Sequence, residues 1–133
     1  MVLVVDTSAM VAILTGEPGA AWLSGELDRS VSPLIAAPVA LELSIVLEAR
    51  APSAVGMGRR ALRDARVRVE PFDQDLAERA VDAWRRYGKG RHPAALNFGD
   101  CCTYALAEHV GLPILCVGND FAQTDLPVLR PPP

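Results

Sequence analysis

Residue types on which several common catalytic motifs depend are scarce in this sequence. It has one lysine, Lys89, among 13 basic residues, together with two histidines and three cysteines. No Cys-x-x-Cys, His-Glu-x-x-His or Gly-Lys-Ser/Thr motif occurs, so the signatures of zinc deaminases, metalloproteases and P-loop proteins are absent. The adjacent Cys101 and Cys102 and the distant Cys116 match neither a zinc site nor a usual disulfide framework. We therefore expect all three cysteines to be reduced.

Net positive charge and long apolar runs are missing as well. Sixteen acidic residues against 13 basic ones give a formal net charge of −3 and a pI near 5.3, so any contact with nucleic acid must be local. No apolar run approaches the roughly 18 residues of a membrane helix. No basic leader with a small-residue cleavage site precedes the first apolar run. We expect a cytoplasmic protein that does not associate with membranes.

The 133 residues, half of them apolar and 22% charged, suit a single domain spanning residues 1–133. Short apolar strands are expected at residues 2–5, 34–36, 67–70 and 114–117. Helices are expected at residues 8–15, 18–29, 38–51, 53–66, 73–87 and 97–107. This alternation predicts an α/β fold with a mostly parallel sheet. In such a sheet the ligand crevice lies beyond the carboxyl ends of the strands.

Two carboxylates follow expected strands and would therefore lie at that edge. Asp6 ends the first strand, and Asp120 follows the strand at 114–117. Each also has a simpler structural interpretation, because Asp6 could cap the first helix and Asp120 could be a turn residue.

Two further carboxylates lie on expected helices. Glu42 shares an apolar stripe with Val39, Ile45 and Val46, where an unpaired carboxylate costs several kcal/mol unless it is neutralised, bound to metal or able to reach water at the rim. Asp100 lies in the first turn of a helix, where free N–H groups favour a negative charge whatever its function.

These four acids have no basic partner within their own motifs, and gathering them in one crevice would raise their pKa values by mutual repulsion. A divalent cation would resolve that conflict. Carboxylate oxygens suit Mg²⁺ or Mn²⁺, and either ion can activate water for attack on phosphorus.

A family resemblance rests on four segments in this order: Val4-Val5-Asp6-Thr7-Ser8-Ala9, Leu41-Glu42, Asn97-Phe98-Gly99-Asp100-Cys101 and Gly118-Asn119-Asp120-Phe121. With the loop at 87–92 and Thr124-Asp125, they resemble a PIN-domain ribonuclease of the VapC toxin type over nearly the whole chain. The resemblance implies a three-layer α/β/α fold with a five-stranded, mostly parallel sheet. It also implies an Mg²⁺-dependent endoribonuclease, usually a homodimer, that a cognate VapB antitoxin silences.

The resemblance also assigns roles to individual residues. Four carboxylates would be catalytic, namely Asp6, Glu42, Asp100 and Asp120, and the three aspartates among them would hold the metal ion. The expected supporting residues are Ser8, Asn97, Thr103 and Asp125. Among these, Ser8 would supply a hydroxyl beside the first aspartate, and Asp125 is the alternative to Asp120 as fourth acid.

Other residues are candidates for contacts with partners. Lys89 and Arg91 in the glycine-rich loop are the expected RNA contacts, and an arginine stripe (Arg59, Arg60, Arg63 and Arg66) either assists them or is a solvated helix face. Apolar residues of the first two helices, Met10, Leu14, Trp22 and Leu23, form either an antitoxin groove or ordinary core. On the helix at 73–87, a face of Leu76, Ala80, Trp84 and Tyr87 is expected to be buried. The alternative to an enzyme is a non-catalytic PIN-like binding or scaffold module.

Overall fold

The computed structural model describes residues 2–133, and within them five parallel strands form one sheet in the order β3-β2-β1-β4-β5. The strands are β1 (Val4–Val5), β2 (Leu34–Ala36), β3 (Arg68–Glu70), β4 (Ile114–Leu115) and β5 (Val128–Leu129). The four strands expected from apolar runs are present. Residue patterns alone did not predict β5, because it is a partly exposed edge strand of only two residues directly after Pro127.

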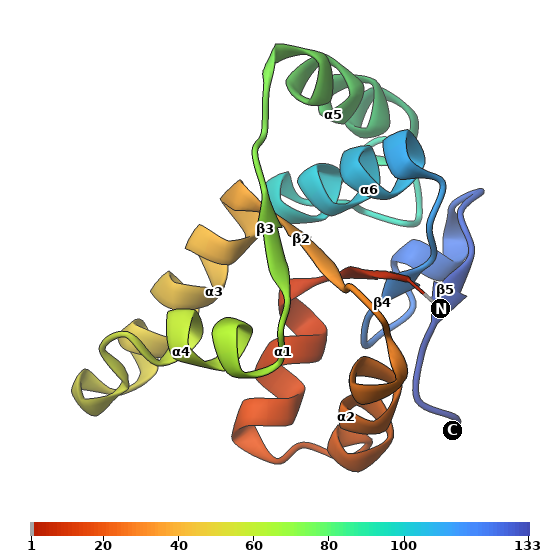
Figure 1. Ribbon diagram of the computed structural model, residues 1–133. Helices are drawn as coiled ribbons and strands as arrows, with labels where there is room; N and C mark the ends of the chain where they lie inside the picture. The colour runs from red at the N-terminus through yellow and green to blue at the C-terminus, as the bar shows by residue number, and fades with distance from the viewer. Residues whose placement is uncertain (1) are drawn as a thin grey trace.

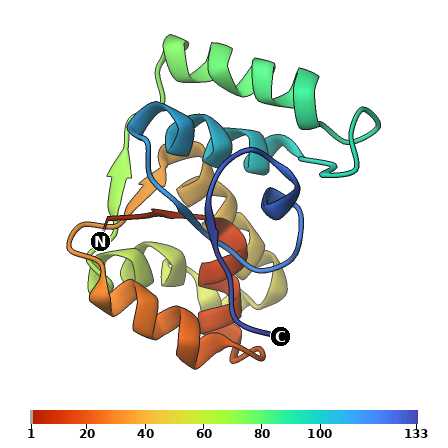
Figure 2. The same cartoon turned by 90° about the vertical axis from the view of Figure 1, so that its right-hand side faces the viewer.

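Six α-helices lie within the described residues: α1 (Thr7–Thr15), α2 (Ala20–Arg29), α3 (Ala37–Arg50), α4 (Met57–Asp64), α5 (Gln74–Tyr87) and α6 (Phe98–Val110). In Figures 1 and 2, α5 and α6 lie on one side of the sheet and α1, α2 and α4 on the other, which gives three layers. Helix α3 leaves the carboxyl end of β2 and packs against α1, α4 and α6. The expected α/β/α architecture is therefore confirmed. No helix within residues 2–133 is both long and apolar enough to cross a membrane.

Helix α4 is shorter than the helix expected over residues 53–66. Pro52–Ala54 form a separate 3-10 turn. Gly56 follows with φ +75°, a left-handed conformation that interrupts the helix and that glycine adopts without strain. Helix α4 therefore begins only at Met57.

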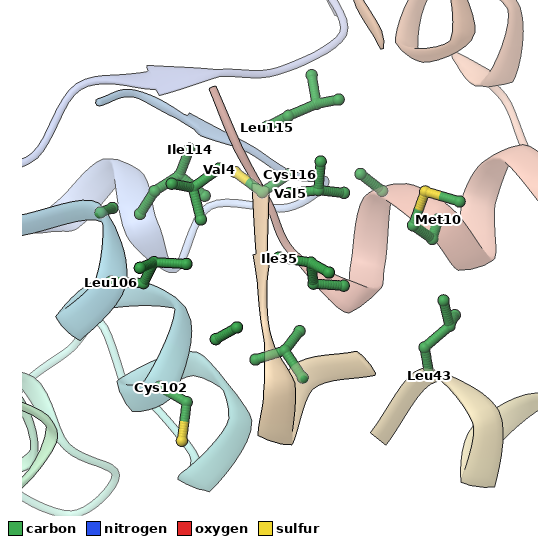
Figure 3. Packing of buried hydrophobic residues seen from close by; sticks show 14 of the residues in the cluster. Val4, Val5, Met10, Ile35, Leu43, Cys102, Leu106, Ile114, Leu115 and Cys116 are labelled. Carbon is green, nitrogen blue, oxygen red and sulfur yellow. The ribbon is translucent and has the colours of Figure 1, made fainter. Parts of the chain in front are cut away.

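The core lies on both faces of the sheet. Figure 3 shows Val5 and Ile35 of the strands between Leu106 of α6 and Met10 and Leu43 from the opposite side. All three cysteines are buried and free, as expected. Met10 and Leu23 are 2% and 0% exposed, so these two residues belong to the core and do not line a groove for a partner.

The expectation that Trp84 is buried is wrong. Helix α5 buries Leu76 and Ala83, with Ala80 and Tyr87 partly buried against the core. These four residues follow the helical repeat closely, whereas Trp84 lies about 80° from Leu76 around the helix axis. Trp84 therefore lies at the edge of the buried face and is 45% exposed.

Candidate active site

Asp6 is the most deeply buried carboxylate of the site, with 3% of its surface exposed. It follows β1 and caps α1, and its Oδ2 accepts a hydrogen bond from the Ser8 backbone N–H at 3.1 Å. Its Oδ1 accepts a bond from the Thr103 hydroxyl of α6 at 2.9 Å. The strand order reverses at β1, and this switch point is where parallel α/β sheets place their ligands.

Glu42 approaches the site from α3. Its Oε1 accepts a hydrogen bond from the Thr7 hydroxyl at 2.6 Å. The carboxyl group lies against Gly99 in the first turn of α6, where an added Cβ would be only 2.4–2.7 Å from the Glu42 carboxyl atoms. Only a residue without a side chain leaves room for Glu42 there. Of the apolar stripe expected around Glu42, Ile45 is instead 59% exposed.

The contact with Gly99 leads to a prediction. For the metal-dependent ribonuclease activity that the family resemblance implies, Gly99→Ala is expected to displace the Glu42 carboxylate and to lower the rate of RNA cleavage about 10- to 100-fold, the usual cost of losing a positioning contact in a metal site, while the protein remains folded. Gly25→Ala on α2 is the matched control, since its added Cβ would meet only Arg29 at 3.6 Å. Initial rates of RNA cleavage by the two variants under the same conditions test this prediction, and equal rates contradict it.

Asp100 and Asn97 cap α6 reciprocally. The Asn97 Oδ1 accepts a bond from the Asp100 N–H at 2.9 Å, and the Asp100 Oδ2 accepts one from the Asn97 N–H at 3.1 Å. Burial raises the pKa of Asp100 to about 7, with further contributions from Asp6, Asp120 and Glu42. The other three predicted acids therefore lie close enough to Asp100 to affect its ionisation.

An acidic hollow of about 370 Å³ opens between β1, β4, α1, α3 and α6. Its lining includes Asp6, Ser8, Glu42, Asn97 and Asp100. Asp120 is exposed on the segment after β4 and makes no capping hydrogen bond there.

Arg50 and Glu17 also line the hollow, and neither was predicted as a site residue. For Arg50 the signal was available, because Glu42, Val46 and Arg50 repeat every four residues and so lie on one side of α3.

The chemistry of the donor set suits a hard divalent cation. The recorded hydrogen bonds to Asp6, Glu42 and Asp100 come from hydroxyl and backbone N–H groups, and no ion pair within residues 2–133 neutralises them. Oxygen donors with unneutralised charge are what Mg²⁺ and Mn²⁺ require. As the side chains lie, no three His, Cys, Asp or Glu residues among residues 2–133 are close enough together to enclose a metal ion.

The hydroxyl groups near Asp6 are arranged differently from the expectation. The Ser8 hydroxyl accepts a hydrogen bond from the Val117 N–H at 3.0 Å, so it links α1 to the end of β4. Thr103 supplies the hydroxyl that contacts Asp6, and Thr7, which was not singled out, holds Glu42.

Asp125 has partners outside the hollow. Its Oδ1 accepts a hydrogen bond from the Tyr104 hydroxyl, and its Oδ2 accepts one from Arg86 at 3.2 Å. The bond from Tyr104 and the charge of Arg86 lower the pKa of Asp125. Asp125 is thus a charged partner of α5 and α6.

The two loop cations lie at the groove next to the hollow, Lys89 in its lining and Arg91 on a residue of its lining. The Arg91 guanidinium stacks over the Trp84 ring at 4.5 Å. Lys89 lines an apolar groove together with Trp84, Phe98 and Asn97, and Asn97 also borders the acidic hollow. The arginine stripe is elsewhere: Arg59 and Arg63 line a separate depression beside α3 and β3.

The family model described as "PIN domain" matches residues 3–126. The chain therefore belongs to the PIN-domain family, as expected.

Within that family, its relatives are VapC ribonucleases. Ribonuclease VapC36 of Mycobacterium tuberculosis is 47% identical over 126 residues, covering 93% of this chain and 91% of the relative. Two solved structures share the fold over 98% of this chain. M. tuberculosis VapC20, described as a sarcin-ricin loop cleaving toxin, has a TM-score of 0.73, 22% identity and 100% coverage of its own chain. A toxin-antitoxin complex from Klebsiella pneumoniae has a TM-score of 0.75, 20% identity and 98% coverage.

Proposed function

We propose that this chain is an Mg²⁺-dependent endoribonuclease and the toxin of a VapB–VapC pair. The observation that carries the proposal is the set of hydrogen-bonded carboxylates Asp6, Glu42 and Asp100 around one hollow, with Asp120 nearby and with no ion pair to the three recorded within residues 2–133. The 47% identity with a named VapC ribonuclease supports the reaction class.

In this proposal Asp6, Asp100 and Asp120 hold Mg²⁺, for which Mn²⁺ can substitute. When bound, the cation supplies Lewis-acid activation of water and of the phosphate group. Glu42, oriented by Thr7 at 2.6 Å, faces the hollow and accepts the proton of the attacking water. Thr103 fixes Asp6 from α6, so the first ligand is oriented before the substrate arrives.

RNA contacts have to be local because the chain is acidic overall. Lys89 and Arg91 lie at the edge of the groove next to the hollow, and Arg50 lines the hollow itself. We propose that these cations hold the phosphates on either side of the cleaved bond. Single-stranded or loop RNA suits such a crevice, since its backbone bends readily and its bases are accessible.

This arrangement predicts the salt dependence of RNA binding. The double variant Lys89→Gln/Arg91→Gln is expected to bind RNA more weakly. The negative slope of the logarithm of the association constant against the logarithm of salt concentration becomes shallower by about 1.4, since each phosphate contact on a single strand contributes about 0.7. Arg59→Gln/Arg63→Gln, which removes the same charge from α4, leaves the slope unchanged. Fluorescence titrations from 50 to 300 mM salt measure both slopes, and the reverse pattern would place the contacts on α4.

A VapB-type antitoxin is the proposed protein partner. An anionic hollow attracts the planar guanidinium fork of an arginine, which binds two carboxylate oxygens and competes with the metal ion. The Klebsiella structure with the same fold is described as a toxin-antitoxin complex. A nuclease that cleaves RNA in its own cytoplasm would require an inhibitor of this kind.

We also propose a homodimer. Exposed apolar side chains surround the groove between α5 and α6, with Val81, Trp84 and Phe98 at 44%, 45% and 79% exposure. Leu41 on α3 extends this surface by one turn from Pro38 in the groove lining. Apolar surface of this kind suits an interface between two copies.

A cleavage assay separates this proposal from a PIN-like scaffold. The purified chain is incubated with stem-loop RNA in Mg²⁺ or in EDTA. Cleavage in Mg²⁺ alone supports the nuclease. If the RNA stays intact at a Mg²⁺ concentration that raises the melting temperature of the protein, the protein binds the cation without cleaving RNA, and this result supports the scaffold.

A further inference from the structure

The segment between β4 and β5, residues 116–127, carries Asp120. No recorded side-chain hydrogen bond or ion pair of Asp120 within residues 2–133 holds this segment in place. Asp120 is exposed and its side chain makes no capping hydrogen bond. The position of this carboxylate therefore depends on the contacts that hold the rest of the segment.

Contacts at both ends hold the segment, in addition to the Val117 N–H bond to the Ser8 hydroxyl and the Gln123 side-chain bond to the Pro93 carbonyl. At its start, Arg130 donates to the Gly118 carbonyl at 3.0 Å and to the Asn119 Oδ1 at 2.9 Å. Phe121 then enters the core with 3% exposure. At its end, the only recorded side-chain partners of Asp125 within residues 2–133 are Tyr104 and Arg86.

Tyr104 connects the contact at Asp125 to the site. It is 1% exposed and lies one helical turn after Asp100 on α6, next to Thr103. Helix α6 therefore supplies Asp100 itself, orients Asp6 through the Thr103 hydroxyl, and contacts the Asp120 segment through the Tyr104 hydroxyl.

We infer that Asp125 is a positioning residue, which receives the Tyr104 hydrogen bond and so holds the β4–β5 segment with Asp120 directed toward Asp100. This inference rests on the proposed metal-dependent function. Asp125 contributes no ligand of its own, because its charge is already paired with the Arg86 guanidinium, whereas no ion pair of Asp120 is recorded within residues 2–133.

Two matched hydroxyl deletions test the inference. Tyr104→Phe removes the bond to Asp125 and the bond that the Tyr104 hydroxyl accepts from Arg86 at 3.3 Å, and it retains both partners of the Arg86–Asp125 ion pair. Tyr87→Phe is the control, because the Tyr87 hydroxyl accepts a bond from the same Arg86 at 3.1 Å and makes no recorded hydrogen bond to the segment. The main readout is the Kd of Mn²⁺ for the RNA-free protein, measured by calorimetry.

We expect Tyr104→Phe to weaken Mn²⁺ binding about 10-fold, as loss of an outer partner of a metal site typically does, and Tyr87→Phe to change it less than twofold. In an Asp120→Asn background, Tyr104→Phe causes no further loss, because it acts through Asp120. Amide exchange over residues 117–127 becomes faster in Tyr104→Phe alone.

Three results overturn the inference. The first is unchanged Mn²⁺ affinity in Tyr104→Phe. The second is an equal effect of Tyr104→Phe with and without Asp120, which would indicate a general loss of structure. An additional large loss in Asp125→Asn on top of Asp120→Asn would make Asp125 a ligand.

RNA cleavage measured in parallel separates this inference from the proposed function. A wild-type protein that binds Mn²⁺ but leaves RNA intact refutes the nuclease, while the Kd comparison still decides the role of Asp125. A wild-type protein that binds no Mn²⁺ refutes both.

Discussion

Asp6→Asn is expected to lower the rate of Mg²⁺-dependent RNA cleavage by more than about 100-fold, because Asp6 is a proposed ligand and loss of an outer partner of a metal site already costs up to about 100-fold. The substitution keeps the shape of the side chain and one oxygen acceptor for the Ser8 N–H, while its new amide N–H group can donate to the Thr103 hydroxyl oxygen. It removes the charge that a hard cation requires. The protein should therefore fold normally and fail to cleave.

Asp28→Asn on the exposed face of α2 is the matched control, because it removes the same charge far from the hollow. Initial cleavage rates at several Mg²⁺ concentrations, with a melting curve for each variant, make the comparison. A wild-type rate in Asp6→Asn that still requires Mg²⁺ would remove Asp6 from the site.

The second large effect concerns pH and metal together. Burial raises the pKa of Asp100 from its ordinary value of 3.8 to about 7 in the folded protein, so the folded state binds the proton more tightly than the unfolded chain does. The stabilisation from this group is fully present below about pH 4 and is lost as the pH rises through 7. Between pH 5.5 and 8, the metal-free protein should lose up to about 2 kcal/mol of its free energy of unfolding.

Mg²⁺ should reverse that trend, because the cation binds the ionised carboxylates and competes with the proton. The rise in Tm caused by millimolar Mg²⁺ is expected to be larger at pH 8 than at pH 5.5. Asp100→Asn is expected to abolish the loss of stability between pH 5.5 and 8 and most of the rise in Tm caused by Mg²⁺. Thermal denaturation of both proteins at the two pH values, with and without Mg²⁺, measures the change in stability with pH and the rise in Tm with Mg²⁺. A pH dependence that persists in Asp100→Asn would assign the titration to another group.

Local patterns predicted the parts of the site that depend on local geometry. Asp6 follows an apolar strand and caps the next helix, and Asn97 and Asp100 are spaced as a reciprocal cap. Both features arise within four residues, where capping chemistry leaves a readable signature.

Contacts between distant segments were not readable in the same way. Thr103 and Asp6 are 97 residues apart, and Thr7 and Glu42 are 35 apart. Nothing local distinguishes Thr7 from Ser8 as the partner of Glu42, since that choice depends on how α1 and α3 pack. The role of Gly99 likewise becomes visible only once Glu42 lies against α6.

The most direct test is to locate the metal ion. Crystals grown with Mn²⁺, in place of Mg²⁺, are measured at a wavelength where manganese scatters anomalously. The account predicts an anomalous peak in the acidic hollow, coordinated by Asp6 and Asp100, with Asp120 directed toward it and Asp125 still bonded to Tyr104. Absence of a peak there at a Mn²⁺ concentration that supports RNA cleavage would contradict the account.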